Sequence, residues 1–233
     1  MVPPESHTPV PAAPGRAARF RLPSGPMPRR SIFIPFAIPL ALAAFLLLTG
    51  CAGIGAGGSG GSGQVLSDAE STRLNLRLPT RAAVVQDRNT ADVYLTDLSP
   101  TTLARLTEGA IGPEISGTLL HIHIFLNPKP GRTPIEDTAA SATARLVVIA
   151  RGQIGVYDGA GFLMPGRSLR KGSAAGTLRN APTRLTRATD GFTDLLGSSR
   201  MEVSFGAKSD EPTAAAIAAA VRTMTLAADP VAD

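Results

Sequence analysis

The chain is poor in the residues that mark many binding and catalytic classes. It contains no tryptophan, two tyrosines, three histidines and one cysteine. A single cysteine excludes an intrachain disulfide, so the fold depends on packing alone. With so few aromatic rings, the chain also lacks the stacking platforms on which single-stranded nucleic acids and sugars bind.

The charge balance also argues against binding to nucleic acids. The formal charge of +5 comes from 23 basic and 18 acidic residues. Five arginines and one glutamate lie in the first 50 residues, which leaves 18 basic and 17 acidic residues in 51–233. A nearly neutral remainder lacks the electrostatic footprint that binding to phosphates requires. We therefore expect no nucleic-acid partner.

What the chain does have is an apolar run that ends at its only cysteine. Ile32–Leu48 follows the basic pair Arg29 and Arg30 and closes with Leu48-Thr49-Gly50-Cys51. A basic segment, an apolar segment and small residues before a cleavage point make up a secretory signal. The tetrad resembles the lipobox of bacterial lipoproteins. This resemblance implies cleavage between Gly50 and Cys51 and a diacylglycerol thioether on Cys51, which becomes the acylated mature N-terminus.

The alternative interpretation is a transmembrane helix with a cysteine at its outer edge. The run has 17 residues, at the lower limit for spanning a bilayer, and Pro35 and Pro39 interrupt it. The small residues Thr49 and Gly50 are what cleavage needs and what a plain anchor does not. We therefore predict a lipoprotein signal peptide over residues 27–50.

Residues on either side of this signal support further expectations. Residues 1–26 contain seven prolines and no apolar period, which is typical of disorder. Either Met27 is the true start, or 1–26 is a cytoplasmic tail lost on cleavage. Ala52, which stands where an aspartate would retain the protein, resembles the sorting signal for the outer membrane. The resemblance implies an envelope protein that is lipid-anchored at the outer membrane and faces the periplasm.

Residues 51–63 are predicted to be the lipidated cysteine and a tether of glycine and serine. Twelve Gly-rich residues, 52–63, give a root-mean-square span of about 19 Å. A single globular domain is expected to follow over residues 64–233, and its length suits one modest core.

The pattern of this domain favours short strands at hairpin spacing. Leucines alternate with polar residues over 74–78, and the pairs 82–86 with 92–97 and 142–150 with 153–157 flank turn residues. Asp158-Gly159 is a second turn signal, and 177–180 and 183–189 are weaker strands. Helices are predicted after Ser99-Pro100 and from about Pro212 to Leu226.

We therefore expect an α+β fold, in which a twisted, mainly antiparallel sheet carries the C-terminal helix on one face. A β-sandwich or a partly closed barrel with that helix as a plug is the alternative.

His121 and His123 are the candidate metal ligands. Their spacing places both rings on the same face of the strand 117–126, which is how two ligands of a zinc or iron site are presented. A third ligand is needed, and Glu136 or Asp137 on the following loop would have to supply it. The competing interpretation is that His121 and His123 lie on the less buried face of the strand, together with Leu119 and Phe125.

Other catalytic patterns are weaker. The chain has no Gly-x-Ser-x-Gly elbow. Asp190 and Asp194 are candidates for a glycosidase pair, but a turn at Asp190-Gly191 with Phe192, Leu195 and Leu196 in the core explains this segment better. Arg167, Arg170 and Lys171 form a small basic cluster. We assign no catalytic residue and expect no cofactor.

Two functions from different classes remain open. The first is a lipid-anchored envelope protein with a non-catalytic binding or scaffolding domain, whose partners are the membrane, through Cys51, and an envelope protein. The alternative is a metal-dependent hydrolase that uses His121 and His123.

Overall fold

The computed structural model describes residues 61–69, 71–129, 139–166, 169 and 172–232. All of these residues belong to one compact unit, Ala52–Asp233. The predicted leader, the signal peptide, Gly50 and Cys51 therefore lie outside the described residues, and so do Glu136 and Asp137. These predictions remain open.

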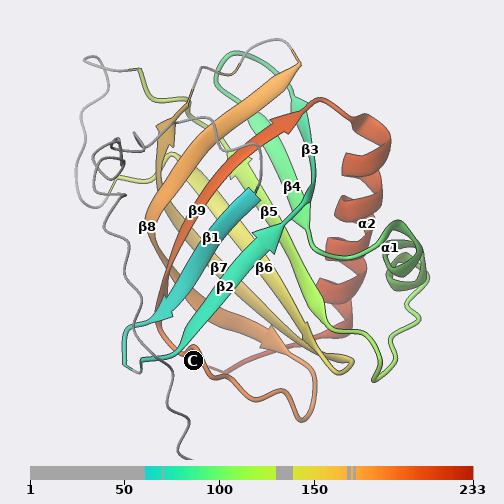
Figure 1. Ribbon diagram of the computed structural model, residues 1–233. Helices are drawn as coiled ribbons and strands as arrows, with labels where there is room; N and C mark the ends of the chain where they lie inside the picture. The colour runs from blue at the N-terminus through green and yellow to red at the C-terminus, as the bar shows by residue number, and fades with distance from the viewer. Residues whose placement is uncertain (1–60, 70, 130–138, 167–168, 170–171, 233) are drawn as a thin grey trace, which may run out of the picture. The chain divides into compact units, whose positions relative to one another are not determined.

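Most of the described strands join one antiparallel sheet (Figure 1). Along the sheet the order is β2-β1-β9-β8-β7-β6-β5-β4-β3. The bounds are Gly61–Ser67 (β1), Arg73–Leu78 (β2), Thr80–Val85 (β3), Ala91–Thr96 (β4), Gly117–Ile124 (β5), Ala142–Ala150 (β6), Gln153–Pro165 (β7), Ser173–Ala188 (β8) and Ser199–Lys208 (β9). A two-residue strand β10, Asp229–Pro230, pairs with β8 off this path.

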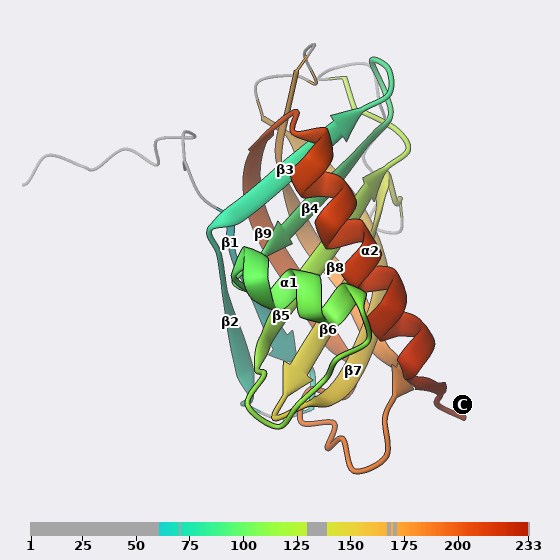
Figure 2. The ribbon, with the colours of Figure 1, turned by 90° about the vertical axis from the view of Figure 1, so that its right-hand side faces the viewer.

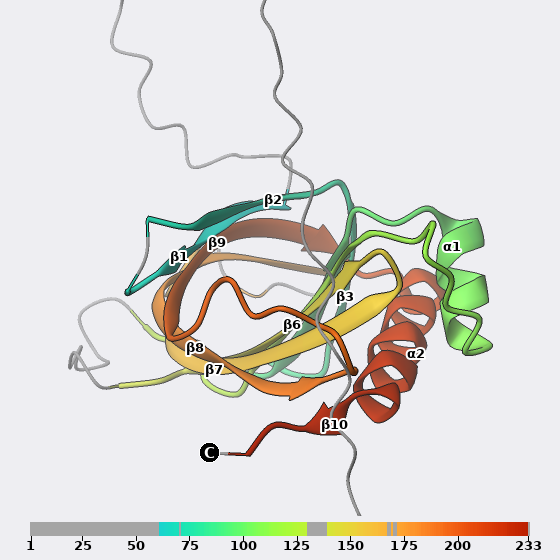
Figure 3. The same cartoon turned by 90° about the horizontal axis from the view of Figure 1, so that it is seen from below.

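The sheet curls until its two edges approach each other (Figure 3). The edge strands β2 and β3 are consecutive in the chain, and Pro79 alone separates them. At the far end of β3, Ala83 forms a bridge with Ser209 and accepts a hydrogen bond from the Asp210 N–H at 3.3 Å. The mainly antiparallel sheet is confirmed, and its curvature fits the partly closed barrel. Two packed sheets, as in a sandwich, are not confirmed, because the described strands belong to one sheet.

The inner face of the sheet holds the larger apolar core. Side chains alternate between the two faces of a strand, and the inward set is almost fully buried. It includes Leu76, Leu78, Leu95, Leu120, Ile122, Leu146, Tyr157, Leu163, Met201 and Val203. The segment between β8 and β9 adds Leu196 and the partly buried Phe192 to this core. Leu195, which we predicted in the core, is instead 62% exposed.

Two helices cover part of the outer face (Figure 2). Helix α1, Pro100–Thr107, begins after Ser99, whose hydroxyl accepts a hydrogen bond from the Thr102 N–H. Helix α2, Glu211–Ala227, begins after Asp210, which caps Thr213 in the same way. Such caps satisfy backbone donors that a helix start leaves free.

The helices enclose a second core with the outward residues of the sheet, including Leu119, Val147, Ile154, Val156, Ile217 and Met224. The C-terminal helix thus lies on one face, as predicted, and not inside the barrel as a plug.

Three local predictions were wrong. Gly61–Gly63, assigned to the tether, lie in β1. Asp158-Gly159 is not a turn, because β7 runs through it and pairs with β6 on one side and β8 on the other. The two weak strands 177–180 and 183–189 form the single strand β8, which bulges between Leu178 and Ala181, where Asn180 has a φ of +52°.

Candidate functional site

Asp92, His121 and His123 form a polar cluster on the outer face of the sheet. Asp92 on β4 lies opposite His123 on β5, and Tyr94 lies opposite His121. The Nε2 atom of His121 and the Nδ1 atom of His123 lie 2.8 and 2.9 Å from the same oxygen, Oδ1 of Asp92. The prediction that both rings share one face is therefore confirmed.

The neighbours of this carboxylate complete its hydrogen bonding. Gln86 donates from Nε2 to Oδ2 of Asp92 at 2.7 Å. The Tyr94 ring stacks on the His121 ring, with centroids 4.6 Å apart and planes 6° from parallel. Because an ionised carboxylate only accepts hydrogen bonds, each histidine donates its N–H to Asp92.

The surroundings also shift the acidity of two groups. Hydrogen bonds from His121 and then His123 hold the pKa of the Asp92 carboxyl below its ordinary value, although burial acts in the opposite direction. Burial raises the pKa of the Tyr94 phenol, and the charge of Asp92 raises it further, while Arg222 on α2 lowers it. Asp92 therefore stays ionised over the range in which proteins usually work.

A polar row continues from this cluster across the next strands. Arg145 on β6 lies directly opposite His121, and Asp158 on β7 lies opposite Arg145. Arg145 donates to the two oxygens of Asp158 at 2.7 and 3.1 Å. Thr186 on β8 donates to the same carboxylate at 2.9 Å. The acids and bases of this row are thus already paired with one another.

The described residues supply no third metal ligand beside the two histidines, and the predicted donors Glu136 and Asp137 lie outside them. Within the described residues, no group of three or more histidine, cysteine, aspartate or glutamate side chains is arranged to hold a metal ion. The nitrogens that face Asp92 are engaged in hydrogen bonds to it. Leu119, placed with the histidines on the less buried face, is fully buried because α1 and α2 cover that end of β5.

The Asp190 and Asp194 segment serves the core. Gly191 has a φ of +81°, which fits the predicted turn. The Asp194 Oδ1 atom accepts a hydrogen bond from the hydroxyl of Tyr157 at 2.7 Å and from the backbone N–H groups of Leu196 and Gly197 at 3.0 Å. The Phe192 ring meets the Tyr157 ring edge-on. Asp194 therefore fixes a loop against the inner core.

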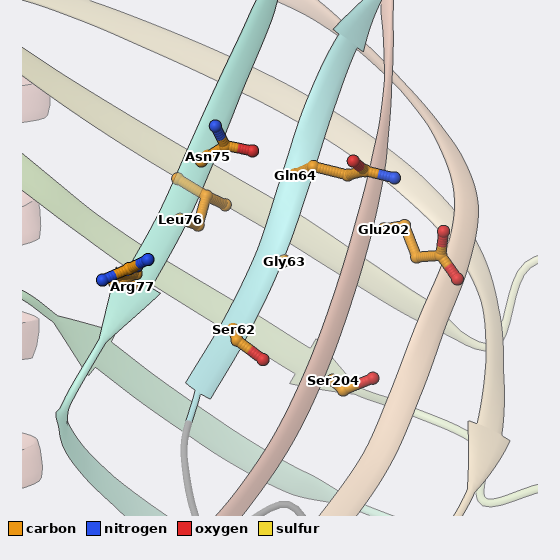
Figure 4. Close-up of a pocket in the computed structure, with 8 residues that line it drawn as sticks. All are labelled: Ser62, Gly63, Gln64, Asn75, Leu76, Arg77, Glu202 and Ser204. Atoms are coloured by element: carbon orange, nitrogen blue, oxygen red, sulfur yellow. The ribbon is translucent and has the colours of Figure 1, made fainter. Parts of the chain in front are cut away.

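A second polar feature lies on the outer face of β2, β1 and β9, and sequence reasoning missed it. It is an open hollow of about 620 Å³, lined by Ser62, Gly63, Gln64, Asn75, Leu76, Arg77, Glu202 and Ser204. We call it the polar hollow (Figure 4). No pattern in the sequence brings these three strands together, because β9 lies more than 100 residues from β1 and β2.

Comparison with known proteins adds no assignment. The chain matches no protein-family model, and no curated protein and no solved structure matches it significantly. None of the helices in the described part of the chain is long and apolar enough to cross a membrane.

Proposed function

We infer that this chain is a lipid-anchored protein of the cell envelope, whose folded domain binds or scaffolds a partner without catalysing a reaction. The observation that carries this proposal is the tetrad Leu48-Thr49-Gly50-Cys51 at the end of an apolar run. It stands just before the start of the folded sheet at Gly61. Ten residues from Cys51 to Gly60 would give a tether of about 17 Å, enough to hold a domain close to a bilayer without fixing its orientation.

The polar side chains of the domain support a binding role better than a catalytic one. His121 and His123 are hydrogen-bonded to Asp92, and Asp194 is bonded to Tyr157 and to the backbone. Groups engaged in this way stabilise the fold. The residues around the polar hollow, in contrast, present unused hydrogen-bonding groups on the surface.

A metal-dependent hydrolase that uses His121 and His123 is the second candidate. It is favoured by one observation: the Asp92 carboxylate is hydrogen-bonded to one nitrogen of each ring, as carboxylates commonly are to histidines that bind a metal through the other nitrogen. Metal analysis of the purified chain separates the two proposals. Stoichiometric zinc that is lost in His121→Ala would support the hydrolase, whereas metal-free wild-type protein would remove it.

The location of the protein in the host cell tests the main proposal. We expect wild-type protein in the outer membrane fraction, because lipidation and cleavage release it from the signal peptide. Cys51→Ala removes the sulfur that takes the lipid, so this variant should stay in the inner membrane through Ile32–Leu48. Equal distribution of the two proteins would contradict the proposal. If the two proteins are distributed differently, as we expect, crosslinking of the wild-type protein in cells would identify an envelope protein bound to the domain.

A further inference from the structure

The polar hollow has an ordered arrangement of side chains. In the strand register, Arg77, Ser62 and Ser204 form one row across β2, β1 and β9, and Asn75, Gln64 and Glu202 form the next row. Neighbouring strands lie about 4.8 Å apart, so each row is about 10 Å long, and the two rows are about 7 Å apart. All six side chains project from the outer face, opposite the buried leucines of β2.

Most of these groups have no partner of their own. Among the described residues, the side chains of Ser62, Gln64, Asn75 and Arg77 make no hydrogen bond or ion pair. Glu202 lies 3.9 Å from Arg179, and both side chains are more than half exposed. Such an exposed ion pair contributes little to stability and leaves the Glu202 carboxylate accessible to a ligand.

The charges lie at opposite sides of the hollow. Figure 4 shows Arg77 on β2 and Glu202 on β9, with Ser62 and Gln64 on the strand between them, β1. A guanidinium binds carboxylates with paired hydrogen bonds, and a carboxylate binds ammonium groups. The amides of Gln64 and Asn75 each offer donors and an acceptor, which match the N–H and C=O of a peptide group.

We propose that the polar hollow binds a short peptide with a free carboxylate and a free amine. The peptide carboxylate lies at Arg77, its ammonium group at Glu202, and its amide groups on Gln64 and Asn75. No aromatic side chain lines the hollow, so the recognition is by hydrogen bonds and charge. This inference rests on the binding role of the domain proposed above, but not on the lipid anchor.

Ligand-detected NMR on the full chain in detergent micelles tests the proposal. The probe is trialanine, and its matched control is the same peptide with an acetylated amine and an amidated carboxylate. We expect saturable binding of trialanine at millimolar concentration, and binding of the blocked peptide about fivefold weaker or less. Equal binding of both peptides, or no binding of trialanine at about 10 mM, would overturn the proposal.

Variants assign the binding to this surface. Arg77→Gln and Glu202→Gln should each weaken trialanine binding about fivefold or more, because each removes one charged partner. Arg73→Gln is the matched control, because Arg73 lies on the same strand outside the hollow. If Arg73→Gln weakens binding as much as Arg77→Gln, the hollow is not the site. Because all three residues are exposed, the variants should fold, and far-UV circular dichroism checks that they do. Loss of envelope localisation in cells would refute the anchor and leave this result unaffected.

Discussion

Replacing Asp194 with alanine should destabilise the domain strongly, although the residue lies in a loop. Its carboxylate is the acceptor for the Tyr157 hydroxyl and for the N–H groups of Leu196 and Gly197. Tyr157 is only 1% exposed, and Asp194 is the acceptor for its hydroxyl. A buried donor left without a partner costs about 1–3 kcal/mol. With a smaller contribution from the two backbone groups, we expect a loss of about 3 kcal/mol in the free energy of unfolding.

Tyr157→Phe provides the matched comparison. It removes the hydroxyl but leaves Asp194 with its two backbone donors, so we expect a loss of about 1 kcal/mol. The two changes should not add. In the double variant the hydroxyl that Asp194→Ala leaves unpaired no longer exists, so the double loss should fall below the sum of the single losses by about 1–2 kcal/mol.

Urea unfolding of the purified chain, followed by circular dichroism, measures these differences. Thermal unfolding gives an independent reading, since each kcal/mol lowers Tm by roughly 2–4 °C in a domain of this size. Asp194→Ala should therefore lower Tm by roughly 6–12 °C. A loss below about 0.5 kcal/mol, within the usual range for surface substitutions, or strict additivity in the double variant, would refute the role assigned to this carboxylate.

Three further predictions concern other parts of the domain. The depressed pKa of Asp92 contributes stability that is present above the unfolded-state value of about 3.9 and is lost as the pH falls through the folded-state value. Asp92→Ala should therefore flatten the acid side of the stability curve measured by urea unfolding, and an unchanged curve would contradict this. Gly63→Val should destabilise β1 by about 2 kcal/mol or more, because a Cβ there would collide with the Glu202 carbonyl oxygen and Val203. Ser62→Ala, exposed on the same strand, should change the unfolding midpoint little. Elemental analysis of the purified protein should find no stoichiometric zinc, and zinc that follows His121 would favour the hydrolase.

Local features of the fold were predictable because their causes are local. The helix starts at Ser99 and Asp210 follow from side chains that cap their own helices. The hairpin between β3 and β4 follows from Asp87, whose carboxylate accepts hydrogen bonds from the N–H groups of Asn89 and Thr90. Both kinds of signal lie within four residues of the structure they determine.

The closure of the sheet was not predictable in the same way. Gly61–Gly63 form a strand because β2 and β9 pair with them from both sides, whereas their composition alone indicates a flexible linker. Asp158-Gly159 has turn composition, yet its pairing partners on β6 and β8 keep it extended. In both segments long-range pairing overrides local preference.

In the candidate sites, too, the local features were predictable and the long-range contacts were not. The common face of His121 and His123 follows from the two-residue period of a strand. Their contact with Asp92 depends on the register between β4 and β5, and Asp92 lies 29 and 31 residues away from them in the chain. The polar hollow depends on strands still further apart. A single sequence specifies such registers only through the whole fold.

The intact mass and the N-terminus of the protein extracted from membranes test the central claim most directly. We predict a chain that begins at Cys51 and carries acyl mass on this residue, and a Cys51→Ala variant that remains uncleaved. This result would place the domain on a lipid anchor and direct the search for its partner to the envelope. An unmodified wild-type chain that retains Ile32–Leu48 would contradict the claim and make the protein a single-span membrane protein.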